Sequence, residues 1–192
     1  DRPVRRADIR SIWVGLRPLV AAPDADKSTQ SLSREHTIVT DDNGLVTVTG
    51  GKWTTYRAMA EDVLDACFAA KVLPQCPGGI SQRHTLVGAP SSGRTPPILQ
   101  APGGHLYGSE LPQVLECPGA DHALGMGLTE AMVRYAARSE YAATVEDVLA
   151  RRSRALFLDS KAALACMQYA ADVIKAHLNH NDEEIDRQKQ EF

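Results

Sequence analysis

The sequence predicts an α+β first part followed by an all-helical second part. Two β-branched runs, residues 37–40 and 45–49, lie on either side of a turn tetrad at residues 41–44 and are expected to be strands. An amphipathic helical pattern begins at Thr54, soon after the second run. Beyond about residue 102, helical patterns take over. The first part is therefore expected to hold a few strands and one helix.

A further strand is expected at residues 9–16, just before Pro18. Arg17 lies where that strand ends, so its side chain can point from a rigid edge into a cleft. Arg34 follows a Ser-rich loop and precedes the strand at residues 37–40. Taken alone, each arginine is better explained as a member of a surface ion pair.

The helix after Thr54 carries one apolar stripe, with Glu61, Asp62 and Asp65 lying off it. Its members are Tyr56, Met59, Ala60, Val63, Leu64 and Phe68. Thr54 or Thr55 is expected to cap this helix. Prolines and glycines between residues 73 and 79 must end it. This predicts a domain boundary that separates residues 1–74 from residues 75–192, with a Gly-, Pro- and Ser-rich surface connection up to about residue 102.

The second part is predicted to be a helical bundle. A short helix is expected at residues 111–115, a longer one at residues 130–138 capped by Thr129, and another that Thr144 and Asp147 begin as a capping box. Two apolar stripes at helical spacing are assigned to its core rather than to a cofactor site. They comprise Val145, Val148, Leu149, Ala155 and Leu156, and then Ala162, Ala163, Cys166, Met167, Ala170, Val173 and Ile174.

Charged residues near the C-terminus invite two functional interpretations, and a simpler one is preferred for each. Arg151, Arg152 and Arg154 could bind a partner or anionic lipid, but acidic residues precede them at helix-pairing distances, which favours a solvated, salt-bridged face. The loose group His177, His180, Asp182 and Glu183 could suggest a metal site. A frayed terminal helix explains that polar tail better, so no metal is expected.

Composition narrows the class of protein. The chain has 192 residues and a formal net charge of −3, with arginines scattered among acidic residues, which argues against nucleic-acid binding. Its four cysteines are too widely spaced for a CxxC motif, which fits a reducing cytoplasmic setting. No apolar run approaches the roughly 20 residues that a spanning helix needs. Any membrane contact is therefore expected to be peripheral.

The most informative stretch joins the strand at residues 45–49 to the helix and reads Gly50-Gly51-Lys52-Trp53-Thr54-Thr55-Tyr56-Arg57. Adjacent glycines let a ligand approach the backbone closely. The free N–H groups of a first helical turn carry about half a positive charge and favour an anion or an electron-rich oxygen. The stretch fits the edge of a cofactor site, although a tight turn between packed elements would explain the glycine pair equally well.

Four segments resemble the FAD-dependent glycerol-3-phosphate dehydrogenases and the related α-glycerophosphate oxidases. They are residues 15–19, 33–36, 49–62 and 140–154. The resemblance extends from about residue 9 to residue 164. It implies that the chain is the C-terminal end of an FAD-binding and substrate domain followed by the family's helical C-terminal domain.

The resemblance also implies site residues and chemistry. Arg17 and Arg34 match the family's substrate-contacting arginines, and Lys52 matches its lysine beside flavin and substrate. Arg17 and Lys52 are the implied catalytic residues, while Gly50, Gly51, Lys52, Thr54 and Thr55 are the implied FAD contacts. The implied reaction oxidises sn-glycerol 3-phosphate to dihydroxyacetone phosphate by hydride transfer to FAD. The implied electron acceptor is a quinone, or oxygen in the oxidase branch.

One familiar element of a flavoenzyme is missing. No Gly-x-Gly-x-x-Gly follows a strand, and the nearest imitation, residues 125–130, lacks the third glycine. The chain begins at Asp1, so we expect the pyrophosphate cradle and the general base in a preceding segment, and we expect the fragment alone to be inactive. The expected location is cytoplasmic, with the inner face of the cytoplasmic membrane as an alternative.

Two alternatives stay open at this stage. The chain could be a noncatalytic module whose helical bundle docks on a membrane, a partner or a second copy in a homo-oligomer, and a large exposed apolar patch on the bundle would favour that. It could also come from another FAD-dependent oxidoreductase that acts on amines or hydroxy acids. Phosphate discrimination by Arg17 would argue against the second alternative.

Overall fold

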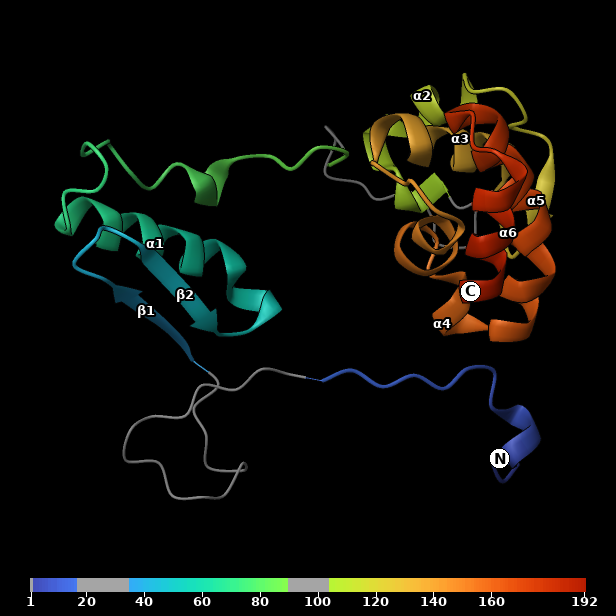
Figure 1. Ribbon diagram of the computed structural model, residues 1–192, viewed down its shortest axis with the longest axis horizontal. Coiled ribbons are helices and arrows are strands. Elements are labelled where there is room, and N and C mark those ends of the chain that lie inside the picture. The colour runs from blue at the N-terminus through green and yellow to red at the C-terminus, as the bar shows by residue number, and fades with distance from the viewer. Residues whose placement is uncertain (1, 17–34, 90–103) are drawn as a thin grey trace. The chain divides into compact units, whose positions relative to one another are not determined.

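The computed structural model of the chain describes residues 2–16, 35–89 and 104–192, which form two compact units (Figure 1). The hairpin unit is Gly15–Thr85, and the helical unit combines Asp1–Val14 with Leu86–Phe192. The predicted boundary after residue 74 remains a prediction. The compact units divide the chain differently, because the first residues of the chain pack against the helical unit.

The hairpin unit consists of two antiparallel strands and one helix. Strand β1 (His36–Thr40) pairs with β2 (Val46–Gly50) in a register that runs from His36 opposite Gly50 to Thr40 opposite Val46. The Gly44 N–H donates to the Asp41 carbonyl at 2.9 Å, and the Asn43 side chain accepts from the Leu45 N–H. Both predicted strands and their turn are confirmed.

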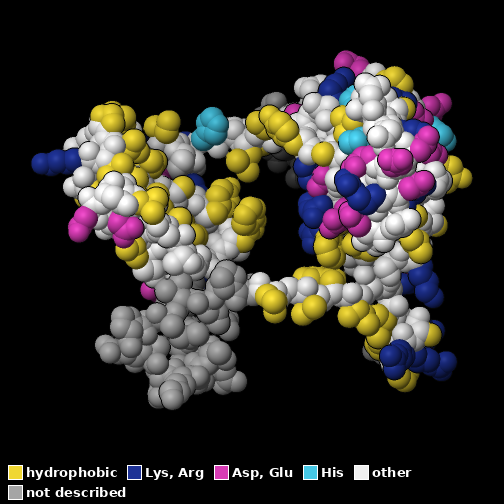
Figure 2. All heavy atoms as spheres, viewed as in Figure 1, with side chains coloured by type: hydrophobic (Ala, Val, Ile, Leu, Met, Phe, Trp, Pro, Cys, Tyr) yellow, Lys and Arg dark blue, Asp and Glu magenta, His cyan; other side chains and the backbone are white. Residues whose placement is uncertain are grey.

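Helix α1 (Tyr56–Ala69) follows a 3₁₀ turn at Trp53–Thr55 and lies along the hairpin (Figure 1). The predicted amphipathic helix is confirmed, but its core is thin. Cys67 is the only buried apolar side chain among the described residues of this unit. Figure 2 accordingly shows hydrophobic side chains across the visible surface of the unit.

Two sequence-based predictions for this half of the chain are wrong. Residues 9–16 contain no strand, because the Arg10 carbonyl accepts from the Ser160 N–H of the helical unit instead of pairing with a neighbouring strand. The threonine cap is also absent: Thr55 occupies the N-cap of α1, but its hydroxyl donates to the Lys52 carbonyl at 3.0 Å. The backbone carbonyl competes successfully for that hydroxyl.

The helical unit is built around a long helix, α5. A small antiparallel hairpin, β3 with β4, makes the unit mostly rather than entirely helical. Its helices and strands are α2 (Leu111–Leu115), β3 (Ala123–Gly125), β4 (Leu128–Thr129), α3 (Glu130–Ser139), α4 (Ala155–Leu158), α5 (Ser160–Leu178) and α6 (Asp182–Glu191). A π-helix spans Asp147–Arg152, and 3₁₀ turns lie at Arg6–Asp8, Gly104–Leu106 and Gly108–Glu110.

The predicted caps of this unit are confirmed. The Thr129 hydroxyl accepts from the Met132 N–H at the start of α3. Thr144 and Asp147 exchange hydrogen bonds, since the Asp147 carboxylate accepts from the Thr144 N–H and the Thr144 hydroxyl accepts from the Asp147 N–H. These bonds satisfy backbone donors at two helix starts.

The predicted core of the helical unit is largely confirmed. Both apolar stripes point inward, with Leu156, Ala162 and Met167 partly rather than fully buried. The core extends from Val114 to Ile185 and also includes Tyr135, whose hydroxyl donates to Glu110 at 2.9 Å. Burial raises the pKa of Tyr135 to about 12. That phenol therefore stays protonated and keeps its hydrogen bond at neutral pH.

The C-terminal tail is ordered, which differs from the expected frayed helix. Ile185 and Gln188 of α6 are both buried. The Gln188 side chain accepts from the Val145 N–H at 3.1 Å and donates to Glu184 at 3.0 Å. A polar residue thus anchors the helix by hydrogen bonding, so apolar periodicity alone does not reveal this anchor.

Replacing the central residue of the core should destabilise the helical unit. Ile174 is fully buried on α5, so Ile174→Ala should lower the free energy of unfolding by about 2–5 kcal/mol. Leu164→Ala on the same helix is the matched control, because Leu164 is 57% exposed. Urea titrations followed by circular dichroism at 222 nm would measure both, and equal losses would contradict the assigned core.

A charged cluster at the start of α3 should make stability depend on pH. The Glu130 carboxylate pairs with His122 at 2.8 Å and with Arg134 at 2.5 Å, and hydrogen bonds from these two residues lower its pKa from 4.5. A lowered folded-state pKa stabilises the protein above about pH 4.5, and this contribution is lost as the pH falls through the folded-state pKa.

We therefore expect Glu130→Gln to lower the free energy of unfolding at pH 7 and to lower it less at pH 3. Urea titrations at both pH values would measure the difference. Glu116→Gln serves as control, because Glu116 is an exposed acid of the same unit. A Glu130→Gln effect that is the same at both pH values would contradict the assigned ion pairs.

Candidate functional site

The glycine turn after β2 places two consecutive residues in the left-handed backbone region. Gly50 has φ +78° and Gly51 has φ +83°, a conformation that side chains other than glycine adopt at a cost. A Cβ at Gly51 would also lie 2.6 Å from the Met59 sulfur and 3.2 Å from the His36 Cβ. The backbone conformation favours glycine at residue 51, whatever the turn binds, and a Cβ there would force the flexible Met59 side chain to move.

The predicted cofactor contacts lie together around this turn. Lys52 is extended and exposed, and its carbonyl accepts from both the N–H and the hydroxyl of Thr55 at 3.0 Å. Thr54 is exposed beside it. Within the described residues the Lys52 ammonium group has no ion-pair partner. The turn therefore presents an uncommitted positive charge next to an accessible backbone.

His36 lies at the base of the same turn and has a partner that sequence reasoning missed. Its Nε2 lies 2.8 Å from an Asp62 carboxylate oxygen on α1, and β-sheet register places His36 opposite Gly50. The pair joins the start of β1 to the helix. Asp62 lies 26 positions along the chain from His36, so no local spacing pattern could reveal the contact.

An exposed aromatic pair follows the turn. Trp53 is 88% exposed and stacks on Tyr56, with ring centroids 5.8 Å apart and an angle of 30° between the planes. The hairpin covers only part of the predicted apolar stripe of α1. Met59 and Val63 are half-buried, whereas Tyr56, Ala60 and Leu64 remain exposed.

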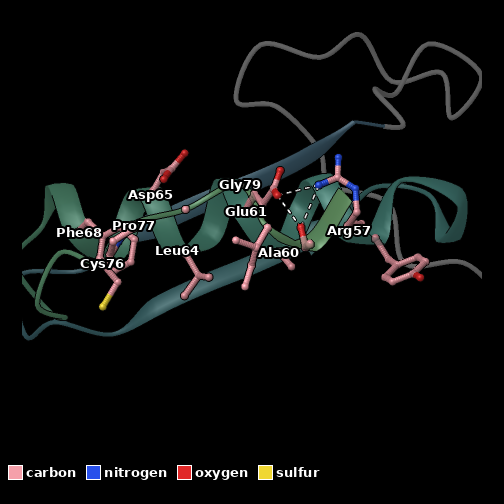
Figure 3. A pocket seen from close by; sticks show the side chains of 13 residues that line it. Arg57, Ala60, Glu61, Leu64, Asp65, Phe68, Cys76, Pro77 and Gly79 are labelled. Atoms are coloured by element: carbon pink, nitrogen blue, oxygen red, sulfur yellow. Dashed lines mark hydrogen bonds and ion pairs between the residues drawn. The ribbon is translucent and has the colours of Figure 1, made fainter. Parts of the chain in front are cut away.

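A groove of about 660 Å³ runs along the uncovered side of α1, between the helix and the segment around Pro77 (Figure 3). Ala60, Leu64 and Phe68 supply helical side chains to its wall. A polar clamp crosses one end, where the Ser81 hydroxyl donates to Glu61 at 2.6 Å and Arg57 pairs with Glu61 at 2.7 Å. These bonds lower the pKa of Glu61, with the Ser81 hydrogen bond contributing most. Ser81 is a residue that sequence reasoning did not single out.

The two predicted substrate arginines, Arg17 and Arg34, lie outside the described residues. Their roles therefore stay predictions. The structure brings together Gly50, Gly51, Lys52, Thr54 and Thr55, which are neighbours in sequence, and adds His36 and Asp62 to their surroundings.

The remaining candidate sites have simpler explanations. Arg151 pairs with Glu146 and Asp147, as expected of a solvated face, while Arg152 donates to the Glu140 carbonyl. Across residues 2–16, 35–89 and 104–192, no three potential metal ligands cluster together. In the same residues, no helix is long and apolar enough to cross a bilayer.

The second part of the chain matches a known domain family. Residues 104–185 match the C-terminal domain of alpha-glycerophosphate oxidase. This match covers the helical unit from the 3₁₀ turn at Gly104–Leu106 into α6. It agrees with the sequence resemblance of residues 140–154.

Similar proteins extend the resemblance to nearly the whole chain. The mitochondrial glycerol-3-phosphate dehydrogenase SDP6 of Arabidopsis thaliana is 37% identical over 221 residues, covering 98% of this chain and 34% of the relative. Glycerol-3-phosphate dehydrogenase 2 of Mycobacterium tuberculosis is 34% identical, covering 97% of this chain and 34% of the relative. The mitochondrial enzyme of Schizosaccharomyces pombe is 31% identical, covering 98% and 37%.

The chain thus spans about a third of the length of the curated relatives it matches. These matches confirm the resemblance drawn from the sequence motifs, and the mixed fold with a mostly helical second part agrees with it.

The glycine turn yields a prediction that is independent of any ligand. Gly51→Ala should destabilise the hairpin unit by about 1–2 kcal/mol for the left-handed backbone, plus about 0.5–1.5 kcal/mol for the side-chain rearrangement that it would force on Met59. Gly79→Ala is the matched control, because Gly79 has φ +84° but a Cβ there would meet no atom within 4 Å. It should show the backbone cost alone.

Hydrogen exchange of the β1 and β2 backbone N–H groups would measure the free energy of unfolding of the hairpin unit in each variant. Equal losses for Gly51→Ala and Gly79→Ala would contradict the crowding at Gly51. Adding Met59→Ala to Gly51→Ala should recover part of the difference between the two glycine variants.

Proposed function

We propose that this chain, the C-terminal part of a glycerol-3-phosphate dehydrogenase, supplies one wall of that enzyme's flavin and substrate site. The observation that carries the proposal is the left-handed Gly50-Gly51 turn with Lys52 beside it, which has no ion-pair partner among the described residues. The relationship to the dehydrogenases implies a flavin cofactor in the longer protein. The proposed reaction is oxidation of sn-glycerol 3-phosphate to dihydroxyacetone phosphate, with FAD, when bound, accepting the hydride.

The residues of the turn are suited to contact the edge of a flavin ring. Gly50 and the 3₁₀ turn Trp53–Thr55 are exposed, so a ligand can reach their backbone. No acidic side chain lies between Gly50 and Arg57 to repel an electron-rich oxygen. Backbone N–H groups of Gly51 and Lys52, with the hydroxyls of Thr54 and Thr55, would stabilise negative charge that develops near them.

Lys52 is proposed to act on the substrate. Glycerol 3-phosphate carries a dianionic phosphate near neutral pH, and an ammonium group binds such an anion as a point charge. Arg17 and Arg34 are proposed to supply planar, bidentate phosphate contacts. Lys52 and Arg17 would hold the carbinol carbon in place for transfer. A general base for the hydroxyl proton is proposed to come from the rest of the longer protein.

Three further features complete the proposal. Electrons would pass to a quinone, as the relationship to dehydrogenases implies, with oxygen as the alternative acceptor of the oxidase branch. The enzyme would be cytoplasmic, because its widely spaced cysteines fit a reducing setting, with peripheral contact to the inner face of the membrane as the alternative. The fragment alone would be inactive, since its sequence holds no dinucleotide-binding fingerprint.

The interaction-module alternative requires an apolar docking patch on the helical bundle. Leu158, Leu164 and Tyr169 are exposed there. The catalytic proposal is preferred because the resemblance to glycerol-3-phosphate dehydrogenases covers nearly the whole chain.

Neutralising Lys52 should impair the longer, flavin-loaded protein. Lys52→Gln should lower kcat/KM for glycerol 3-phosphate by about 10- to 100-fold, the range expected for losing a charge-assisted hydrogen bond. Arg17→Ala should have an effect at least as large. Glycerol 3-phosphate-dependent dye reduction would measure all variants, with the present fragment as the inactive reference.

Lys71→Gln is the matched control, because Lys71 is an exposed lysine that follows α1 in the same unit. It should behave like the wild type. Wild-type activity in both Lys52→Gln and Arg17→Ala would contradict the proposed site. An inactive longer protein would favour the interaction module.

A further inference from the structure

Helix α5 packs one side into the core of the helical unit and leaves another side uncovered. On the uncovered side, Leu164 is 57% exposed and Tyr169 is 53% exposed. Charged, polar and small side chains lie around them. We call the exposed residues of this helix between positions 161 and 172 the α5 face, which consists of Lys161, Leu164, Ala165, Gln168, Tyr169 and Asp172.

The two charges of the α5 face lie at its opposite ends. Eleven positions, about three helical turns, separate Lys161 from Asp172, so both lie on one line along the helix. Asp172 accepts a hydrogen bond from Gln168 at 2.8 Å. The nearby Lys175 is bound to Asp182 instead. In the part of the chain that the structure describes, neither Lys161 nor Asp172 has an ion-pair partner.

A face with opposite charges at its two ends is complementary to a second copy of itself in the reverse direction. A two-fold axis that passes between residues 166 and 167 sets Lys161 of each copy opposite Asp172 of the other. It also sets Ala165 opposite Gln168, and the small alanine lets the two helices approach closely. A parallel pairing in the same register would place like charges together. Charge therefore selects the antiparallel arrangement.

The apolar side chains of the α5 face fit the same arrangement. At 3.6 residues per turn, Leu164 lies roughly 70° to one side of the charged line, and Tyr169 lies roughly 70° to the other side. The two-fold axis keeps each side of the interface on its own side. The two copies of Leu164 would therefore lie along one border of the contact, and the two copies of Tyr169 along the other.

A hollow of about 240 Å³ lies beside the acidic end of the α5 face. Buried Leu124 and Val173 line it together with Tyr169 and Asp172. The antiparallel pairing brings the second copy's Lys161 to this end, where its aliphatic stem would meet apolar side chains and its ammonium group would meet a carboxylate. The other residues that line the hollow are charged and pair with one another: His122, Glu130 and Arg134.

We propose that the α5 face is the interface of an antiparallel homodimer, held by two Lys161–Asp172 ion pairs and by contacts of Leu164 and Tyr169. This inference goes beyond the proposed function and does not depend on it. The contact is one helix wide, so it should bury less than the roughly 1,200–2,000 Å² of a stable interface, and we expect a Kd on the order of 10–100 µM. At about 1 µM the chain would be monomeric, so the dimer would not affect unfolding measured there.

Reversing either charge should weaken the dimer. Lys161→Glu and Asp172→Lys each replace two attractions across the two-fold axis with two repulsions, so each should raise the Kd about tenfold. Sedimentation velocity of the present chain between about 1 and 200 µM would measure this. The fold should survive, because an acidic residue is favourable in the first turn of α5 and lysine is a good helix former. Circular dichroism at 222 nm would verify it.

Mixing the two variants gives the specific test. In a mixed dimer, Glu at position 161 of one copy faces Lys at position 172 of the other, and the native Lys161–Asp172 pair forms at the other end. An equimolar mixture should therefore restore the Kd to within about twofold of the wild type. Both variants keep a negative net charge, so overall attraction between them cannot explain such a recovery.

Lys71→Glu and Glu116→Lys are the matched controls, because both residues are exposed and lie outside the α5 face. Each should dimerise like the wild type, alone and mixed. A wild-type chain that stays monomeric up to about 200 µM would overturn the homodimer. A dimer that neither charge reversal weakens, or a mixture no tighter than its components, would overturn the α5 face as its interface and place the contact on another surface.

Discussion

Burial of one face of α5 is the constraint on which the rest of the helical unit depends. Helices α3, α4 and α6 and the strand β3 all pack against this single helix. Small buried side chains at Ala163, Cys166 and Ala170 let these neighbours approach closely. The approach leaves no spare room, since a Cβ at Gly125 would lie 2.6 Å from the Cys166 sulfur. The β3–β4 hairpin therefore requires glycine where it crosses α5.

The hairpin unit is stabilised by different means. With Cys67 as its one buried apolar side chain in the described residues, it relies on strand pairing, on the Asn43 turn and on polar links from α1. The His36–Asp62 pair and the Arg57–Glu61–Ser81 clamp are such links. Local bonds suffice to shape the glycine turn, but they leave an apolar side of α1 open. The proposed site is consequently carried by the less buried of the two units.

Residues 10 and 11 are held at a fixed place on the helical unit. A helical C-terminal domain that only packed upon itself would be a separate module. Here the cap of its central helix also binds Arg10, so one carboxylate serves both the fold of the domain and the position of a distant segment. Stability of α5 and placement of residues 10–13 are therefore coupled through Asp159.

Much of this protein was determined by local sequence. The β-branched runs and the Asp41–Gly44 turn specified the hairpin, helical periodicity specified α1 and the core face of α5, and Thr129 and Thr144 specified helix starts, because each depends on residues within a few positions of one another. The Gly-Gly-Lys motif likewise located the candidate turn and its family resemblance.

Only the tertiary structure decided the rest. Residues 9–16 have the sequence pattern of a strand, but a strand needs a neighbouring strand for its backbone hydrogen bonds. The Arg10 carbonyl instead accepts a hydrogen bond from the Ser160 N–H. The pairing of His36 with Asp62, the anchoring of α6 by Gln188 and the ion pair of Arg10 with Asp159 all join residues far apart in the chain. Such contacts depend on which distant groups folding brings together, so no local pattern of residues can encode them.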